Sequence, residues 1–229
     1  MRVLAIECST DWLAVALGDA DGFVERRERA GQAHSERVLP VVDALLDEAG
    51  LALSGLGGIA FGAGPGSFTG VRIACAVAQG LALGAGLPVV AVSTLEAIAE
   101  DASRQHGARR VYACADARMR EVYVAAYERA GAHWREIVAP AVLKPADVEP
   151  PAGGWFGAGD GFAAHPEIAG RRAFTGIDAA ILPSAASIGV IGRAHLMAGH
   201  GVKAAEARPI YVRQRVALTS AERAAGTRL

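Results

Sequence analysis

The chain has 229 residues, a formal net charge of −1 and a hydrophobic content of 52%. This composition is typical of a globular protein and excludes a disordered one, since disorder requires few apolar residues and a high net charge. The near-zero charge also argues against a protein whose main task is to hold phosphate backbones, because that task usually requires a strongly basic face.

The N-terminal half alternates strand patterns with helix patterns. We expect strands at 3–8, 12–17 and 23–29, a helix at 34–49, a strand at 58–62, a helix at 69–83, a strand at 89–92 and a helix ending near 104. Pro40 either delays the first helix or kinks it, and Gly84 is expected to end the second. Ser93 and Glu96 have the spacing of a capping box for the third helix.

The C-terminal half opens on a second hairpin pattern. We expect strands at 111–116, 121–127, 134–138 and 155–158, a helix at 184–197, a last strand at 209–213 and a loose tail after Gln214. A shift of 109 residues places Glu7 over Asp116, where a duplicated unit would begin.

The order βββαβαβα predicts an α/β fold of the actin-like ATPase (ribonuclease H-like) class. Its two similar lobes would each have a βββαβα-type mixed sheet flanked by helices. The predicted divisions are an N-terminal lobe at 1–105, a C-terminal lobe at 106–213 and a tail at 214–229.

One long stretch resembles a membrane segment at first reading. From Ala49 to Leu95 the only charged residue is Arg72. Glycines and Pro88 interrupt the stretch so often that no apolar run of roughly 18 residues remains to cross a bilayer. The apolar run at the N-terminus is stopped by Glu7 and is too short for a signal sequence. We therefore expect a cytoplasmic protein that does not insert into membranes.

A glycine-rich loop precedes the second predicted helix. Such a loop can hold an anion with its free backbone N–H groups. It has no lysine for a Walker A motif, and Ser67 or Thr69 stands where a dinucleotide motif needs its third glycine. The alternative is a structural turn capped by Thr69. The loop consists of Gly64, Pro65, Gly66, Ser67, Phe68, Thr69 and Gly70.

The second helix is apolar nearly all round, so it is expected to be buried on more than one side. One sheet covers only one face of a helix, and the remaining apolar surface is either packed internally or a partner interface, which we favour. Arg72 begins this helix, and its charge predicts either a buried ion pair or a contact with an anion or partner.

No catalytic constellation is recognisable. The six histidines form neither HExxH nor HxxxH, and the three scattered cysteines form no CxxC. In an actin-like fold, phosphates lie against the two hairpin turns, and the second turn carries Arg118 where a glycine would allow close approach. This argues against ATP in the cleft.

The sequence resembles the TsaB family, the non-catalytic subunits of the bacterial machinery that places threonylcarbamoyl on the tRNA adenosine beside the anticodon. The resemblance is carried, in order along the chain, by the segments RVLAIECST, HSERVLP, FGAGPGSFTGVRIACAVAQGLALG, VVAVSTLEA, DARMREVY and PIYVR. The catalytic relative TsaD has a metal-binding His-x-x-x-His, for which this chain has Thr94 and Ile98.

The resemblance implies a scaffold that pairs with TsaD through its first two helices, is joined by the ATPase TsaE, and forms a homodimer when alone. It implies no cofactor of its own, ATP and metal on TsaD, and tRNA contact only indirectly through the complex. The partner-facing residues would be Ser35, Leu39, Val42, Leu46, Arg72, Cys75 and Gln79. Besides the glycine loop, the family-motif residues are Asp116, Arg118, Glu121, Tyr123, Tyr211 and Arg213.

A second hypothesis remains open, a stand-alone ATPase or glycopeptidase-like metalloprotease of the actin-like superfamily. The two hypotheses differ at Thr94, Ile98 and Arg118, where the residue types favour the scaffold.

Overall fold

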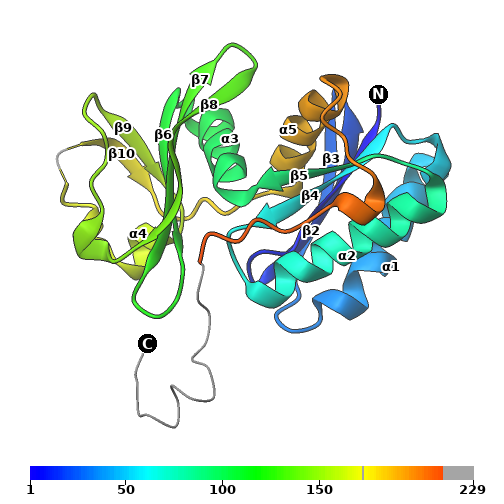
Figure 1. The fold of residues 1–229 in the computed structure, drawn as a ribbon, viewed down its shortest axis with the longest axis horizontal. Coiled ribbons are helices and arrows are strands. Elements are labelled where there is room, and N and C mark those ends of the chain that lie inside the picture. Colours follow the sequence, from blue (N-terminus) through cyan, green and yellow to red (C-terminus); the bar gives the residue numbers. More distant parts are fainter. Residues whose placement is uncertain (172, 214–229) are drawn as a thin grey trace, which may run out of the picture.

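The computed structural model describes residues 1–171 and 173–213 and has two five-stranded mixed sheets side by side (Figure 1). The first sheet has the order β3-β2-β1-β4-β5 and the second the order β10-β9-β6-β7-β8. Read from the opposite edge, the second order repeats the first, with β6 in the place of β1. The two-lobed α/β prediction is therefore confirmed, and the duplication is clearer in the topology than in the residues.

The strands of the first sheet are β1 (Val3–Glu7), β2 (Trp12–Asp19), β3 (Gly22–Arg29), β4 (Gly58–Gly64) and β5 (Val89–Ser93). Those of the second are β6 (Arg110–Asp116), β7 (Val122–Ala130), β8 (His133–Leu143), β9 (Trp155–Ala158) and β10 (Phe174–Asp178). The helices are α1 (His34–Ala49), α2 (Phe68–Ala85), α3 (Thr94–His106), α4 (Gly161–Ala164) and α5 (Ala185–Met197). Strand β10 and helix α4 were not predicted.

The two faces of the first sheet bury different helices, because side chains along a strand alternate in direction. Leu4 and Ile6 of β1 pack in one core with α1 and α2. Val3 and Ala5 of the same strand pack in another core with α5. Figure 1 shows α1 and α2 on one side of this sheet and α5 on the other.

Helices α3 and α5 each pack against the sheet of the other half of the chain. Helix α3 packs against β6 and β7 of the second sheet, through Leu95 and Ile98. Helix α5 lies at 185–197, within the predicted C-terminal lobe, yet it packs against β1, β2 and β4 of the first sheet. The chain therefore crosses between the lobes twice. A division at residue 105 consequently separates α3 and α5 from the sheets against which they pack.

Several local predictions are corrected. Helix α1 begins at His34 and contains Pro40, so the proline does not delay it. Helix α2 continues through Gly84 and ends where Gly86 adopts a left-handed conformation, with φ of 68°. Ser93 does precede α3, but its side chain makes no cap hydrogen bond and its hydroxyl instead lies 3.3 Å from that of Tyr127. The capping box is thus absent.

The strand predicted at 209–213 is also wrong, because these residues have irregular backbone. They run along the lobe junction, where only the N–H of Ile210 bonds to β4. The predicted tail at 214–229 lies outside the described residues.

Helix α2 is long and apolar enough to cross a membrane by length and composition alone. In the structure it packs against β4, with Ala74 and Ala78 fully buried. Its apolar character is therefore used, in part, to build the core of the first lobe.

Candidate functional site

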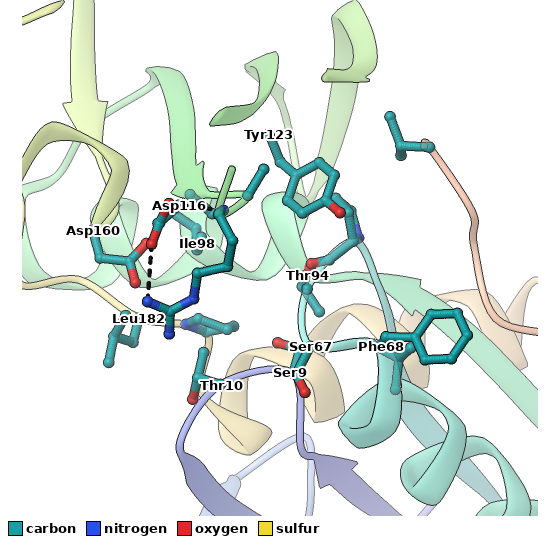
Figure 2. A pocket seen from close by; sticks show the side chains of 18 of the residues that line it. Ser9, Thr10, Ser67, Phe68, Thr94, Ile98, Asp116, Tyr123, Asp160 and Leu182 are labelled. Carbon is teal, nitrogen blue, oxygen red and sulfur yellow. Dashed lines mark hydrogen bonds and ion pairs between the residues drawn. The ribbon is translucent and has the colours of Figure 1, made fainter. Parts of the chain in front are cut away.

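A cavity of about 520 Å³ lies between the two lobes. It is lined from the first lobe by the β1–β2 turn and the β4–α2 loop, and from the second lobe by the β6–β7 turn. Figure 2 shows Ser9, Thr10 and Ser67 on one side and Asp116 and Asp160 on the other. We call this cavity the interlobe cleft.

The glycine loop is shaped by its packing against the β1–β2 turn. A Cβ on Gly66 would lie 2.7 Å from the carbonyl oxygen of Ser9, and one on Gly70 would lie 1.8 Å from that of Cys8. Both positions therefore exclude any larger residue.

Two of the loop's backbone N–H groups already have partners within the chain. Ser67 donates its N–H to Ser9, and its hydroxyl accepts a bond from the N–H of Gly70, so Ser67 rather than Thr69 caps α2. Because these amides are bonded within the chain, the loop fits the structural turn better than an anion cradle.

Thr94 and Ile98, matched in sequence to the two histidines of a metal-binding relative, line the interlobe cleft. Both are buried, and the hydroxyl of Thr94 donates a hydrogen bond to the carbonyl of Pro65. Across residues 1–171 and 173–213, no group of three or more His, Cys, Asp and Glu side chains is placed to hold a metal ion. The residues present here are therefore unsuited to a metal centre of that kind.

The second-lobe wall of the cleft is an ion cluster. Arg118 lies 3.2 Å from Asp116, and the N–H of Asp116 donates to Asp160 over 2.9 Å. Burial raises the pKa of Asp160. The Arg118 guanidinium thus pairs with Asp116 at the second hairpin turn, where an actin-like ATPase would need an open backbone turn.

The β6–β7 turn that carries Arg118 is conformationally unusual. Arg118, Met119 and Arg120 have φ values of 59°, 54° and 59°, a region that side chains other than glycine rarely adopt. Arg118 of this turn lines the cleft, and backbone strain of this kind is concentrated at functional sites.

Glu7 lies fully buried beneath the cleft floor. Its Oε1 accepts a hydrogen bond from the N–H of Ser9, whereas Oε2 has no partner among the described residues and packs against Gly62. Burial raises the pKa of this carboxyl to about 7. The group is therefore sensitive to pH near neutrality, although it does not face the cleft.

Arg213 joins two of the predicted motif segments. Its guanidinium lies 2.5 Å from the carboxylate of Glu121 and donates to the carbonyl of Ala117 over 3.1 Å. Tyr123 and Tyr211 line the cleft beside it. The structure thus brings the DARMREVY and PIYVR segments together.

The predicted partner-facing residues do not share one surface. Ser35 and Leu39 are exposed on α1, but Val42, Leu46 and Cys75 are buried within the chain. The amide of Gln79 donates to the carbonyl of Ala207 over 3.1 Å. A turn at Ala204–Glu206, near the end of the described chain, therefore covers part of the apolar face of α2.

Arg72 has no carboxylate partner in the part of the chain that the structure describes. Its guanidinium lies 3.3 Å from the ring centroid of Phe68 and 5.0 Å from that of Tyr211, and it donates to the carbonyl of Phe68. The buried ion pair, one of the two sequence readings, is therefore wrong. The charge lies between two aromatic rings at the head of α2.

The solvent-facing side of α2 carries a line of uncharged residues at helical spacing. Ala76, Gly80 and Leu83 are exposed, and Ile73 is half-buried. Leu83 has 76% of its surface exposed. Unlike Val42 or Cys75, these residues can contact another molecule without unfolding the lobe. We call them the α2 face.

Sequence reasoning missed Asp160, Arg120 and Lys144. The signal for Asp160 was the repeat of FGAG at 61–64 and 156–159, which ends a strand before a helix in both lobes. The covering of α2 by the Ala204–Glu206 turn has no local sequence signal.

A family model described as "TsaD: tRNA N6-adenosine threonylcarbamoyltransferase" matches residues 25–221. The tRNA threonylcarbamoyladenosine biosynthesis protein TsaB of Escherichia coli K12 is 41% identical over 224 residues, which covers 95% of this chain and 96% of that protein. The TsaB of Haemophilus influenzae is 37% identical over 226 residues, covering 94% and 95%.

Solved structures agree. YeaZ from Pseudomonas aeruginosa has 42% identity and a TM-score of 0.86, covering 92% of this chain and 99% of that one. A second structure from that organism, described as similar to the peptidase YeaZ, has 42% identity and a TM-score of 0.87, covering 93% and 99%. These matches include both lobes and the cleft between them.

Proposed function

We propose that this chain, which belongs to the TsaB family of tRNA threonylcarbamoyladenosine biosynthesis proteins, acts in that pathway as a non-catalytic scaffold. It pairs in the cytoplasm with the threonylcarbamoyltransferase subunit TsaD, and the ATPase TsaE joins the pair. ATP and metal belong to those partners, and this chain needs no cofactor of its own.

The observation that carries the proposal is the uncharged α2 face. Ile73, Ala76 and Leu83 leave apolar surface in water on a helix whose other side is already packed on the sheet. Exposed apolar surface of this kind marks a protein interface. Leu39, on the neighbouring helix α1, is a further apolar side chain with 45% of its surface exposed.

The same surface suits a second copy of this chain. Helix faces with small residues such as Ala76 and Gly80 allow close approach of a partner helix. We therefore propose a homodimer through α1 and α2 when TsaD is absent, with the two partners competing for one face.

The interlobe cleft supports a non-catalytic role. Thr94 and Ile98 supply no metal ligand, and Arg118 neutralises Asp116 at the second hairpin turn. The competing function, a stand-alone ATPase or metalloprotease, would need a nucleotide or metal site that these residues do not build.

Depletion with complementation tests the proposal. Cells depleted of this protein should lose threonylcarbamoyladenosine from their tRNA, measured by mass spectrometry of nucleosides, and the parent chain should restore it. The purified chain should co-purify with TsaD and turn over no ATP by itself.

Two results would contradict the proposal. Unchanged threonylcarbamoyladenosine after depletion would remove the pathway assignment. Peptidase or ATPase activity that stayed with this chain through further purification would replace the scaffold by an enzyme.

A further inference from the structure

Four of the largest exposed apolar side chains lie close together at the lobe junction. Phe68, Ile210 and Tyr211 line the interlobe cleft, and Met119 lines a neighbouring groove of about 920 Å³. Arg213 lines both cavities, so the two are adjacent. Phe68 is 52% exposed and Tyr211 is 55% exposed.

Cations are interleaved with these apolar groups. Arg72 lies between the rings of Phe68 and Tyr211. Arg120 and Lys144 are exposed in the neighbouring groove. None of these three cations has a carboxylate within ion-pair distance in the described part of the chain.

The carboxylates of the two cavities are, by contrast, already engaged. Asp11 lies 3.9 Å from Arg29, Asp116 3.2 Å from Arg118, Glu121 2.5 Å from Arg213 and Glu167 3.7 Å from His165, while Asp160 accepts from the N–H of Asp116. Asp11, Asp116 and Glu121 are thus paired with arginines, whereas Arg72, Arg120 and Lys144 remain available to an anion.

We propose that this surface, made of Phe68, Arg72, Met119, Arg120, Lys144 and Tyr211, binds an unpaired RNA loop directly. Exposed aromatic rings stack unpaired bases, and cations beside them hold the phosphates, which is how single-stranded nucleic acid is bound without a deep pocket. We call it the basic–aromatic surface.

A protein partner fits this surface less well than it fits the α2 face. The α2 face is uncharged and continuous along one helix, whereas the basic–aromatic surface joins two lobes and carries Arg72, Arg120 and Lys144, which have no ion pair in the described part of the chain. Charge complementarity therefore favours a polyanion here. The inference rests on the proposed function, in which the substrate is a tRNA loop, but it replaces the expected indirect contact by a direct one.

Binding of labelled RNA tests the inference. The probe is an RNA hairpin with a single-stranded loop, compared with a fully paired RNA duplex of equal length, and fluorescence anisotropy is recorded with the full chain and with its complex with TsaD. The parent should bind the hairpin more tightly than the duplex. Phe68→Ala and Tyr211→Ala should each weaken hairpin binding about tenfold, because each removes one stacking contact.

Lysine and arginine variants test the phosphate contacts. Arg120→Ala combined with Lys144→Ala should lower the salt dependence of hairpin binding, since each lost phosphate contact reduces the slope by about 0.7 for a single strand. Val24→Ala and Lys203→Ala change exposed residues elsewhere and should bind like the parent. Phe68→Trp keeps an aromatic ring and should retain affinity.

Equal affinity of the parent for hairpin and duplex, or unchanged binding by Phe68→Ala in both preparations, would overturn the inference. If Phe68→Ala instead lost TsaD and kept its RNA affinity, the surface would be a protein contact and the scaffold proposal would stand. Failure of the parent chain to co-purify with TsaD would remove the scaffold proposal, whatever the RNA affinities.

Discussion

The backbone N–H of Ile210 donates a hydrogen bond to the carbonyl of Ala63 over 2.8 Å, which ties the last described segment to the end of β4. Three residues later, Arg213 bonds to Ala117 and Glu121 of the second lobe. Three residues before Ile210, the carbonyl of Ala207 accepts a hydrogen bond from the side-chain amide of Gln79 on α2. One segment therefore links the α2 helix, the cleft and the β6–β7 turn.

Charge substitutions on α2 should separate folding from partner binding. Cys75→Asp places a carboxylate in the core beside Ala207 and should lower the free energy of unfolding by about 3 kcal/mol or more. Leu83→Asp changes a side chain that is 76% exposed and should leave the melting temperature nearly unchanged while abolishing TsaD binding. Thermal melting and co-purification are the two measurements, and Val24→Asp on β3 is the matched surface control. Normal TsaD binding by folded Leu83→Asp would place the interface elsewhere.

The glycines of α2 should respond in opposite directions to alanine. Gly70→Ala would bring a Cβ against the carbonyl of Cys8, at 1.8 Å, and should destabilise the chain by about 2–4 kcal/mol. Gly80→Ala meets nothing within 4 Å and should stabilise it by about 0.5–1 kcal/mol, because alanine loses less backbone freedom in a helix. Urea unfolding measures the free energy of unfolding of both variants. Equal changes would show that the close contact of α2 with the end of β1 does not limit the residue at position 70.

Glu7 should make stability fall as pH rises through neutrality. Burial raises the pKa of this carboxyl from 4.5 to about 7, so the folded state holds the proton more tightly than the unfolded chain does. Stability is then greatest below the unfolded pKa and falls until the pH passes the folded pKa, by about 3 kcal/mol in total.

Glu7→Gln removes this proton-binding difference. Relative to the parent, it should gain up to about 2–3 kcal/mol in the free energy of unfolding at about pH 8 and little at about pH 5. Burial also raises the pKa of Glu96 to about 7, so the free energy of unfolding of the variant still depends partly on pH. Glu36→Gln, on the exposed side of α1, is the control. Urea unfolding at both pH values is the measurement. If the free energy of unfolding changed with pH by the same amount in parent and variant, Glu7 would not be the titrating group.

Asp101 should be a major link between α3 and α5. Its carboxylate accepts bonds from the N–H and hydroxyl of Ser184 and from the hydroxyl of Ser187, at 2.7–2.9 Å. Asp101→Ala leaves these buried donors unpaired and should cost about 2–4 kcal/mol. Asp43→Ala, which removes an exposed carboxylate from α1, should cost less than about 0.5 kcal/mol. Chemical denaturation distinguishes them, and a small loss for Asp101→Ala would show that the two helices are held by apolar packing alone.

Local patterns predicted most of the elements because the apolar periodicity and the turn residues act over a few positions. The three N-terminal strands, α1, β4 and α3 all lie within a few residues of their predicted ranges. Predictions of caps were less accurate: Ser67 caps α2 in place of Thr69, and Ser93 faces Tyr127. A side-chain hydroxyl has several acceptors within reach, and only the packed backbone decides among them.

The candidate site was predicted less completely than the fold. Glu121 and Arg213 were identified as motif residues, but their ion pair joins positions 92 residues apart and has no local signal. Val42, Leu46 and Cys75 were expected at a partner surface and are buried instead. Apolar character predicts that a residue is buried, yet it does not distinguish burial within this chain from burial at an interface with another protein.

The sequence by itself determined the element order of the N-terminal half, the two-lobed α/β class and the glycine turn before α2, because these depend on periodicity and on local backbone freedom. Only the tertiary structure decided which apolar surface stays exposed, which charges are free and where the lobes meet. Those properties depend on long-range contacts, such as Gln79 with Ala207 and Arg72 with Tyr211, that bring distant segments together. The sparse charges between Ala49 and Leu95 thus reflect one helix packed on a sheet, with an outer face that is exposed and uncharged.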